Sequence, residues 1–568
     1  MKFPLKYLLI YSQLGLVLPV GIVQKDIPMI CDRCKGFKAK DRSVPCTVLE
    51  GHPCAPCKER ERIRRKIGQL EEELTNLKAQ YKTLASATNT IHDPFIHKFP
   101  PEIASHIFRL SLPVLNFGEH GPRATNQLSG RTQWAVPLRL GAVSRKWRQL
   151  AWETPDLWQT VFIHIHPSTS HFLAQSLPGL LREWLERSAV LPLTILFHDF
   201  RYSDQTNLDD AWTEDEFSDD STSDMSEFPT NQILEILNFD SDRWRNLHIS
   251  AGPHIFGRFS CSIQPPQLVD LDLTLNLSLS QDPIPKFLIG SELNPTHLKL
   301  TGFPLTSINV HWDNITHATL CKTRIEECID FLRRASSLEY CHICTPSEVH
   351  DSMIDFGKPI IQPRLRSLNL ATSYATSILE AIHLPSLEEW TQDMGGLRIP
   401  TAVMLSLLER SGCFLKVLNL ENVPLPSQDL DALLQALSSL EVLRLCFKWG
   451  FLDISIMNDI ITRIFCAAPG CNLSVEAAIP DYLLPRLQSI EIMPFAPYLW
   501  DQLPQLYRQG QRKTLKLKSA AFKSHITDET ASQLLQLLDE GVDLQILDET
   551  VGGDFLENFK IRIHERSF

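Results

Sequence analysis

Leu415-Lys-Val-Leu-Asn-Leu420 and Leu440-Glu-Val-Leu-Arg-Leu445 are two copies of a six-residue pattern that recurs through most of the chain. Two further clear copies are Leu268-Val-Asp-Leu-Asp-Leu273 and Leu365-Arg-Ser-Leu-Asn-Leu370. The alternation of apolar and polar residues within each copy predicts a short, half-buried strand. Its central residue, the anchor, can be followed along the chain at Leu247, Leu271, Leu298, Ala318, Cys341, Leu368, Trp390, Leu418, Leu443, Ile490 and Leu515.

Successive anchors are 24, 27, 20, 23, 27, 22, 28, 25, 47 and 25 residues apart. Segments with helical spacing of apolar residues lie between them, for example at 402–410, 430–438 and 456–467. A period of about 20–29 residues, with one strand and one helix per unit, is typical of leucine-rich-repeat solenoids. We therefore predict an α/β fold with an irregular leucine-rich-repeat domain over residues 170–550, and one degenerate repeat inside the longest interval. Within this domain, residues 203–228 are acidic and poor in aliphatic residues, which predicts a disordered insertion.

Three segments precede the repeats in a fixed order: Phe99-Pro-Pro-Glu-Ile-Ala-Ser-His-Ile-Phe108, Leu140-Gly-Ala-Val-Ser-Arg-Lys-Trp-Arg-Gln-Leu-Ala151 and Thr154-Pro-Asp-Leu-Trp158. The first two have helical spacing of apolar residues, and a loop over 113–136 is predicted between them. Together they resemble the F-box, which we place at residues 95–162. Segments 181–195 and 242–249 are similar to the junctions of F-box proteins from mushroom-forming fungi.

The resemblance implies a function for this segment. F-box proteins dock on the Skp adaptor, which connects the cullin core of a ubiquitin ligase to its substrate receptors, and here an unknown protein client would bind the repeats. The expected adaptor-binding residues are Pro101, Ile103, Ile107, Phe108, Leu138, Val143, Trp147 and Leu150. Among the large apolar residues, Trp147 and Trp158 are those that we most expect to be internal.

Residues 59–90 carry a heptad pattern. Apolar residues occur at Ile63, Ile67, Leu70, Leu74, Leu77, Tyr81 and Leu84, with alternating spacings of 4 and 3. This pattern predicts a short coiled coil, with self-association through residues 63–84. An amphipathic helix that packs on its own domain stays open as an alternative.

Residues 25–58 are rich in cysteine. Cys31-x2-Cys34 and Cys54-x2-Cys57 have the spacing of a structural zinc site with four thiolate ligands. The segment also resembles the fungal binuclear zinc cluster, but that cluster uses six cysteines and only five occur here. A zinc-dependent, DNA-binding regulator that dimerises through the coiled coil is therefore the alternative function, and it predicts salt-dependent DNA binding that a chelator abolishes. No other cofactor is expected.

Composition limits the remaining possibilities. A chain of 568 residues with 43% hydrophobic and 21% charged residues is expected to fold into at least two globular domains. A net charge of −12 argues against a general nucleic-acid-binding surface. No phosphate-binding glycine loop, His-Glu-x-x-His or Gly-x-Ser-x-Gly motif occurs, so we expect a non-catalytic protein.

Two features of the sequence bear on the cellular compartment: the scattered cysteines and the apolar N-terminal segment. The nine cysteines from Cys261 to Cys471 are expected to be small buried hydrophobes in a reducing compartment. Residues 1–24 resemble a signal-peptide core, with Lys2 and Lys6 before an apolar stretch that is short for a membrane span. Pro19 interrupts this stretch and no clear cleavage site follows it. We interpret the segment as an apolar leader or a gene-model extension, with a secretory signal as the alternative, and expect a cytoplasmic or nuclear protein without a membrane partner.

Overall fold

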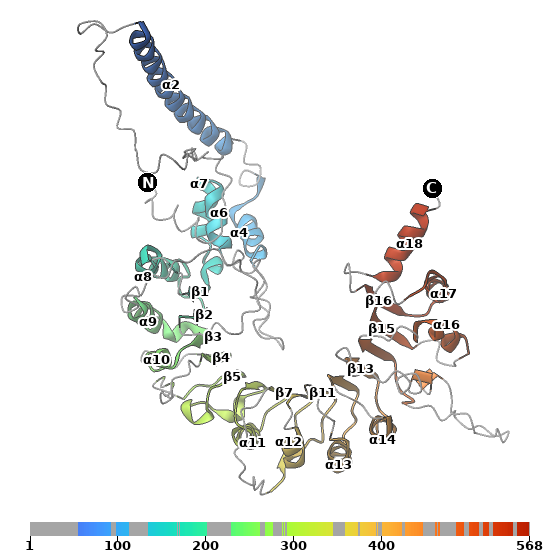
Figure 1. Cartoon of the computed structure of the whole chain (residues 1–568). Helices are drawn as coiled ribbons and strands as arrows, with labels where there is room; N and C mark the ends of the chain where they lie inside the picture. Colours follow the sequence, from blue (N-terminus) through green and yellow to red (C-terminus); the bar gives the residue numbers. More distant parts are fainter. Residues whose placement is uncertain are drawn as a thin grey trace, which may run out of the picture. The chain divides into compact units, whose positions relative to one another are not determined.

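The structure, a computed structural model, is a mixed α/β protein that divides into two compact units (Figure 1). Unit 1 comprises Met1–Val161 and Ser170–Leu191, and unit 2 comprises Phe162–Thr169 and Pro192–Phe568. The residues that the structure describes are 55–91, 98–112, 135–166, 169, 171–201, 229–261, 267–276, 287, 289, 292–344, 358–372, 375–393, 395, 400–422, 427–446, 461–462, 464–465, 484–493, 499–509, 515–521, 526–548 and 554–566.

Unit 1 is helical. Its described elements are α2 (Ala55–Ile91), α4 (Pro101–Leu110), α6 (Val136–Val143), α7 (Arg145–Trp152), the 3-10 helix η2 (Pro155–Trp158) and α8 (His171–Arg187). Pro101 and Pro137 stand in the first turns of α4 and α6, where a missing amide donor costs nothing. Ser144 separates α6 from α7, and its side chain accepts a hydrogen bond from the backbone amide of Trp147. The two helices predicted for this segment are therefore present, and the second is divided in two at Ser144.

Unit 2 is built on one long sheet. In spatial order its strands are β1 (Thr160–Ile165), β2 (Leu193–Asp199), β3 (Trp244–Ala251), β4 (Asp270–Leu275), β5 (His297–Thr301), β6 (His317–Cys321), β7 (Tyr340–Cys344), β9 (Ser367–Ala371), β11 (Glu389–Asp393), β12 (Val417–Glu421), β13 (Val442–Cys446), β14 (Ser489–Met493), β15 (Lys516–Ala521) and β16 (Leu544–Asp548). Every neighbouring pair from β2 to β16 is parallel. A separate parallel pair consists of β8 (Ile360–Ile361) and β10 (Ile382–His383).

Parallel neighbours require a crossover, and helices supply many of the crossovers in unit 2. The described α-helices are α9 (Thr230–Phe239), α10 (Pro253–Phe256), α11 (Ile325–Arg334), α12 (Ala375–Ala381), α13 (Thr401–Ser411), α14 (Ser427–Ala436), α16 (Leu499–Gln509), α17 (Asp528–Asp539) and α18 (Phe555–Arg566). The short 3-10 helices are η5 (Ser241–Arg243), η6 (Leu305–Ser307) and η7 (Trp312–Asn314). In Figure 1, α11 to α14 follow one another along one side of the strands that they connect.

The register of the sheet confirms ten of the eleven predicted anchors. From Leu247 to Ile490 each anchor is the direct partner of the next, and the exposed fraction of each is 2% or less. The eleventh is wrong by two residues, because Leu517 rather than Leu515 pairs with Ile490. Both leucines are buried, and a pattern of period two cannot distinguish positions two residues apart.

The longest interval between anchors separates β13 from β14, which pair directly with each other in the sheet. Between residues 446 and 489 the structure describes only 461–462, 464–465 and 484–488, and none of these belongs to a strand. The helical residues at 461–462 and 464–465 lie within the helix predicted at 456–467. The degenerate repeat predicted for this interval falls largely outside the described residues.

The cysteines of β6 and β7 depart in part from the expectation of reduced thiols. Cys341 is fully buried on the anchor side, where burial raises the pKa of its thiol to about 12. Cys321 and Cys344 are register partners on the opposite side of these strands and form a disulfide. A bridge between neighbouring strands that are 23 residues apart in sequence limits the freedom of the unfolded chain and thereby stabilises the fold.

Candidate docking surfaces

Helix α4 has two apolar sides. Ala104 and Phe108 point into unit 1, and the exposed fraction of Phe108 is only 1%. Ile103, Ile107 and Leu110 form a second row at spacings of four and three, with exposed fractions of 47%, 37% and 70%. Residues at these spacings lie on one side of a helix. We call these three residues the α4 stripe.

The core of unit 1 is filled without the α4 stripe. The ring of Phe108 lies 4.9 Å from the ring of Trp147, centroid to centroid, and both pack against a cluster that includes Trp158. The indole Nε1 of Trp158 donates a 2.8 Å hydrogen bond to the carbonyl oxygen of Ala151. Trp184 of α8 meets Trp158 edge to face, with 4.7 Å between the ring centroids. The large rings therefore form the buried cluster of the described part of unit 1. The residues of the α4 stripe are not part of this cluster and remain exposed.

Polar contacts hold α4 in its orientation. The hydroxyl of Thr154 donates to the Ser105 hydroxyl at 3.0 Å, which ties α4 to the turn before η2. Arg109 lies 3.5 Å from the carboxylate of Asp156, but both side chains are about half exposed, so this ion pair stabilises little. The helix is thus oriented mainly by Phe108 and by the Thr154 hydrogen bond.

The structure divides the predicted adaptor-binding residues into two groups. Pro101, Ile103, Ile107 and Val143 are exposed, so a partner could contact them directly. The others belong to the interior or to its edge: Phe108 is buried, and Leu138, Trp147 and Leu150 are half-buried against the same cluster.

Two exposed apolar residues beside this surface were not among the predicted site residues. Leu110 lies seven residues after Ile103, so the helical period alone could have included it. Trp152 is 40% exposed, and the guanidinium of Arg187 lies 4.6 Å from the centroid of its ring. Cation–π contact of this kind fixes the indole plane. The sequence spacing does not indicate the contact between Trp152 and Arg187, because the two residues lie on different helices, α7 and α8.

The heptad residues lie on the long helix α2. The seven apolar residues from Ile63 to Leu84 have exposed fractions between 47% and 76%, and no described side chain of α2 is buried. The interpretation that this helix packs on its own domain therefore finds no support among the described contacts.

The predicted zinc ligands cannot be placed. Cys31, Cys34 and Cys54 lie outside the described residues, and Cys57 falls in the first turn of α2 without a described side chain. Among the residues that are described, no three His, Cys, Asp or Glu side chains are arranged to hold a metal ion. The apolar leader 1–24 and the acidic insertion 203–228 also lie outside the described residues.

The sheet of unit 2 presents a second surface, on the side opposite to the anchors. Because successive side chains of a strand point to opposite sides, the residue after each anchor belongs to this side. We call it the strand face. Its central row, in register, is His248, Asp272, Lys299, Thr319, His342, Asn369, Thr391, Asn419, Arg444, Glu491 and Lys518.

The strand face of β3 to β5 carries a group of interacting charges. A carboxylate oxygen of Asp272 lies 3.1 Å from Lys299 Nζ and 3.6 Å from His248 Nδ1. Burial raises the pKa of Asp272, but the hydrogen bond of His248 and the charge of Lys299 outweigh burial and leave this pKa below its usual value. Burial raises the pKa of the neighbouring Asp270 to about 6. The pKa of His198 on β2 is lowered to about 4, also chiefly by burial.

From β11 to β15 the same row forms a ladder of polar contacts. The amide of Asn419 donates to the Thr391 hydroxyl at 2.8 Å, and Arg444 donates to the Asn419 oxygen at 3.3 Å. Arg444 Nε is 3.5 Å from Glu491, which also lies 3.2 Å from Lys518 Nζ. Charges of both signs alternate here, so this surface suits a polar ligand with complementary charges.

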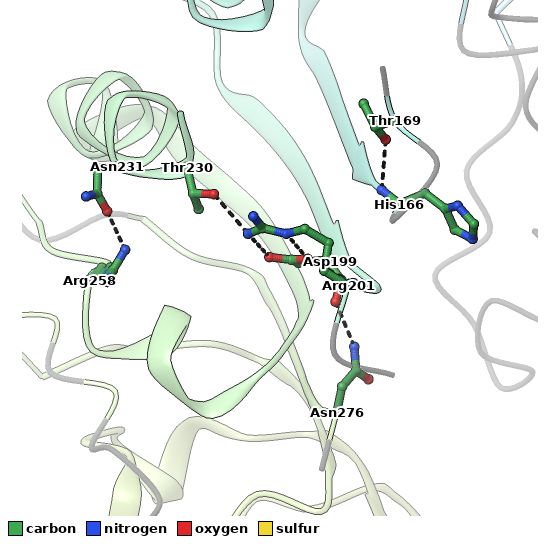
Figure 2. Close-up of polar contacts among 8 residues, drawn as sticks. All are labelled: His166, Thr169, Asp199, Arg201, Thr230, Asn231, Arg258 and Asn276. Carbon is green, nitrogen blue, oxygen red and sulfur yellow. Dashed lines mark hydrogen bonds and ion pairs between the residues drawn. The ribbon is translucent and has the colours of Figure 1, made fainter. Parts of the chain in front are cut away.

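A buried ion pair lies at the end of β2, on the anchor side of the sheet and next to the acidic insertion in the sequence. Figure 2 shows Arg201 between Asp199, at the end of β2, and Thr230, at the start of α9. Arg201 Nη2 lies 2.7 Å from Asp199 Oδ2 and donates a 2.9 Å hydrogen bond to the Thr230 hydroxyl. Asn276 donates to the backbone oxygen of Asp199 at 3.2 Å. Arg201, the last residue described before the insertion, is thus hydrogen-bonded to Thr230, the second residue described after it. We call this contact the Arg201 clasp.

None of the helices that the structure describes is long and apolar enough to cross a membrane. No family model matches the sequence, and no curated protein matches it either. The function is therefore argued from the two surfaces themselves.

Proposed function

We propose that this protein is a substrate receptor of an SCF-type ubiquitin ligase. In this proposal the helices of unit 1 are an F-box that docks on the Skp adaptor, and unit 2 is a leucine-rich-repeat domain that binds a client protein. The observation that carries the proposal is the exposed α4 stripe beside a buried aromatic cluster to which it does not belong. It occurs in the segment whose motifs resemble the F-box.

The stripe has the chemistry of a partner-binding surface. Three large aliphatic side chains form one row on a ten-residue helix, and no described residue of unit 1 buries them. Water contact with them is unfavourable. A partner groove that covers them removes this cost and places them at the centre of an interface, where apolar anchors contribute most. Pro101, at the start of the same helix, and Val143, at the end of α6, are also exposed.

Unit 2 supports the second half of the proposal. The strands of its long sheet follow one another in chain order and are parallel from β2 to β16, which supports a repeat solenoid. The strand face would bind the client through its alternating charges. The receptor would act by proximity, because a bound client is held at a high effective concentration beside the ubiquitin-transfer enzyme. We propose the cytoplasm or the nucleus as its compartment, since these ligases act there.

The adaptor contact can be tested with single substitutions in the full chain. Ile107→Asp places a carboxylate in the proposed contact, whereas Val190→Asp places the same group on an exposed apolar residue of unit 1 outside the α4 stripe. The first variant should lose co-purification with a recombinant Skp-family adaptor, and the second should retain it. Equal retention by both variants would refute the assignment of the α4 stripe.

The client surface needs a separate experiment. A variant that carries Ile107→Asp should still capture the client but not promote its ubiquitylation, so it acts as a trap. Adding Arg444→Ala, which breaks the ladder on β13, should reduce the captured client, whereas Lys416→Ala should not. Lys416 pairs with Glu388 just before the strands and makes a suitable control, because it is about as exposed as Arg444. Client capture that is insensitive to Arg444→Ala would exclude this part of the strand face.

A further inference from the structure

The apolar row of α2 has no described partner within the chain. All seven of its residues, from Ile63 to Leu84, are roughly half exposed or more along a continuous 37-residue helix. In proteins, helices draw most of their stability from packing of an apolar face, so we expect another surface to cover the apolar row of α2. The question is which surface covers the row.

The heptad positions form one apolar seam. In the register set by the spacings, Ile67, Leu74 and Tyr81 take the a positions, while Leu70, Leu77 and Leu84 follow Ile63 at the d positions. Leucine at d, with a β-branched residue at a, is typical of parallel dimers. Three of the four d positions are leucine, but only Ile67 among the a positions is β-branched, so the orientation depends on the flanking charges. The apolar row is therefore suited to an identical helix.

The flanking charges select the orientation of that helix. In a parallel pair in register, each g residue meets the e residue five positions later in the other chain. This rule pairs Lys66 with Glu71 of the second copy and Glu73 with Lys78 of the second copy, and symmetry repeats both contacts. All four contacts are attractive.

The opposite orientation is disfavoured, because each antiparallel register covers at most six of the seven apolar residues. The register that sets Ile67 against Leu77 of the second copy brings Glu71 against Glu71, Glu73 against Glu73, and Arg64 against Lys78, and these like charges destabilise it. The register that sets Ile67 against Leu84 has two attractive contacts, Glu71 with Lys78 and its symmetry copy, whereas the parallel pair has four. A further parallel contact, between Glu59 and Arg64 of the second copy, competes with contacts inside one helix, because Glu59 already pairs with Arg62 and Arg64 with Glu61. The two central contacts therefore carry the specificity.

We propose that α2 binds a second copy of this chain as a parallel, in-register, two-stranded coiled coil. The apolar row provides the affinity, and the pairs Lys66–Glu71 and Glu73–Lys78 between the two copies determine register and orientation. The proposal is independent of the ubiquitin-ligase function, since it rests on α2 alone.

The first test is the mass of the full chain in solution, measured by sedimentation at about 10–50 μM, where an interface of this size is expected to be populated. The wild type should have about twice the chain mass of 64.7 kDa. Leu74→Asp should give the single-chain mass, while Ala79→Asp, at the outward f position, should leave the dimer intact. A monomeric wild type, or a dimer that Leu74→Asp leaves unchanged, would overturn the proposal.

The second test determines the orientation by charge exchange. Lys66→Glu turns two attractive contacts into repulsive ones and should weaken the dimer about tenfold at low salt. The double variant Lys66→Glu with Glu71→Lys restores opposite charges only in the parallel, in-register pair, so it should recover the wild-type dissociation constant. A double variant that stays as weak as the single variant would refute the parallel arrangement, and helical circular dichroism verifies that both variants still form α2.

Discussion

The two sides of α4 predict opposite effects for two substitutions that are five residues apart. Phe108→Ala removes a side chain that is 1% exposed and packs on Trp147, and cavities of this kind cost about 3–5 kcal/mol. Since whole domains have a stability of about 5–15 kcal/mol, unit 1 should lose a large share of its stability. Binding of the adaptor should then fall only because the folded unit is less populated.

Ile103→Asp should weaken binding without unfolding unit 1. Ile103 is 47% exposed and lies in the first turn of α4, where a carboxylate interacts favourably with the helix dipole. Full burial of an isoleucine contributes about 1.5–3 kcal/mol, so covering the exposed half contributes about 1 kcal/mol. Burying an unpaired carboxylate in its place costs several kcal/mol more, so the affinity should fall at least about 100-fold.

Two measurements on the full chain separate the effects. Hydrogen exchange of the α7 amides reports the opening of unit 1 irrespective of unit 2, and calorimetric titration with the adaptor reports the affinity. We expect faster exchange for Phe108→Ala and unchanged exchange for Ile103→Asp. If Phe108→Ala left exchange unchanged, or if Ile103→Asp accelerated it equally, the division of α4 into an inner and an outer side would be incorrect.

Three further predictions concern other parts of the chain. Gly68→Ala should stabilise α2 by about 1 kcal/mol per chain, since glycine is a poor helix former and nothing lies within 4 Å of the added methyl; thermal melts followed by helical circular dichroism should show this gain. Asp199→Ala removes the carboxylate beside the buried Arg201 guanidinium and should cost about 3–5 kcal/mol in urea denaturation, and adding Arg201→Met should recover much of this loss. Because the pKa of Asp270 is higher in the fold than its usual value of 3.8, stability should fall as pH rises from about 4 to about 6. Asp270→Asn should therefore gain up to about 3 kcal/mol at pH 7.5 and nothing near pH 4, as measured by urea midpoints at both values.

The strands of unit 2 could be predicted from the sequence because their anchors recur at a nearly constant interval. Ala318, Cys341 and Trp390 are not leucines, yet their spacing placed them correctly among the anchors. The error occurs where neither the repeat period nor burial distinguishes two positions. Leu515 and Leu517 are both buried and lie two residues apart, so a pattern of period two fits either of them as the anchor.

The candidate site was harder to predict from the sequence, because helical spacing identifies the sides of a helix but not which side faces the interior. Ile107 and Phe108 are adjacent, equally apolar and equally suited to a partner. Only the position of Trp147, which α7 brings to Phe108, decides that Phe108 is internal. The repeats were predicted to bind the client, but the residues of the strand face were not identified, since polar residues such as His248 and Asp272 are recognisable as a group only when the register places them side by side.

The Arg201 clasp has a consequence for engineering. It joins the two ends of the 202–228 segment through Asp199 and Thr230, so the sheet does not depend on how many residues connect them. Doubling a loop of this kind costs only about 0.6 kcal/mol in closure entropy. A fluorescent reporter or an epitope tag spliced between 202 and 228 should therefore be tolerated, which provides an internal labelling position.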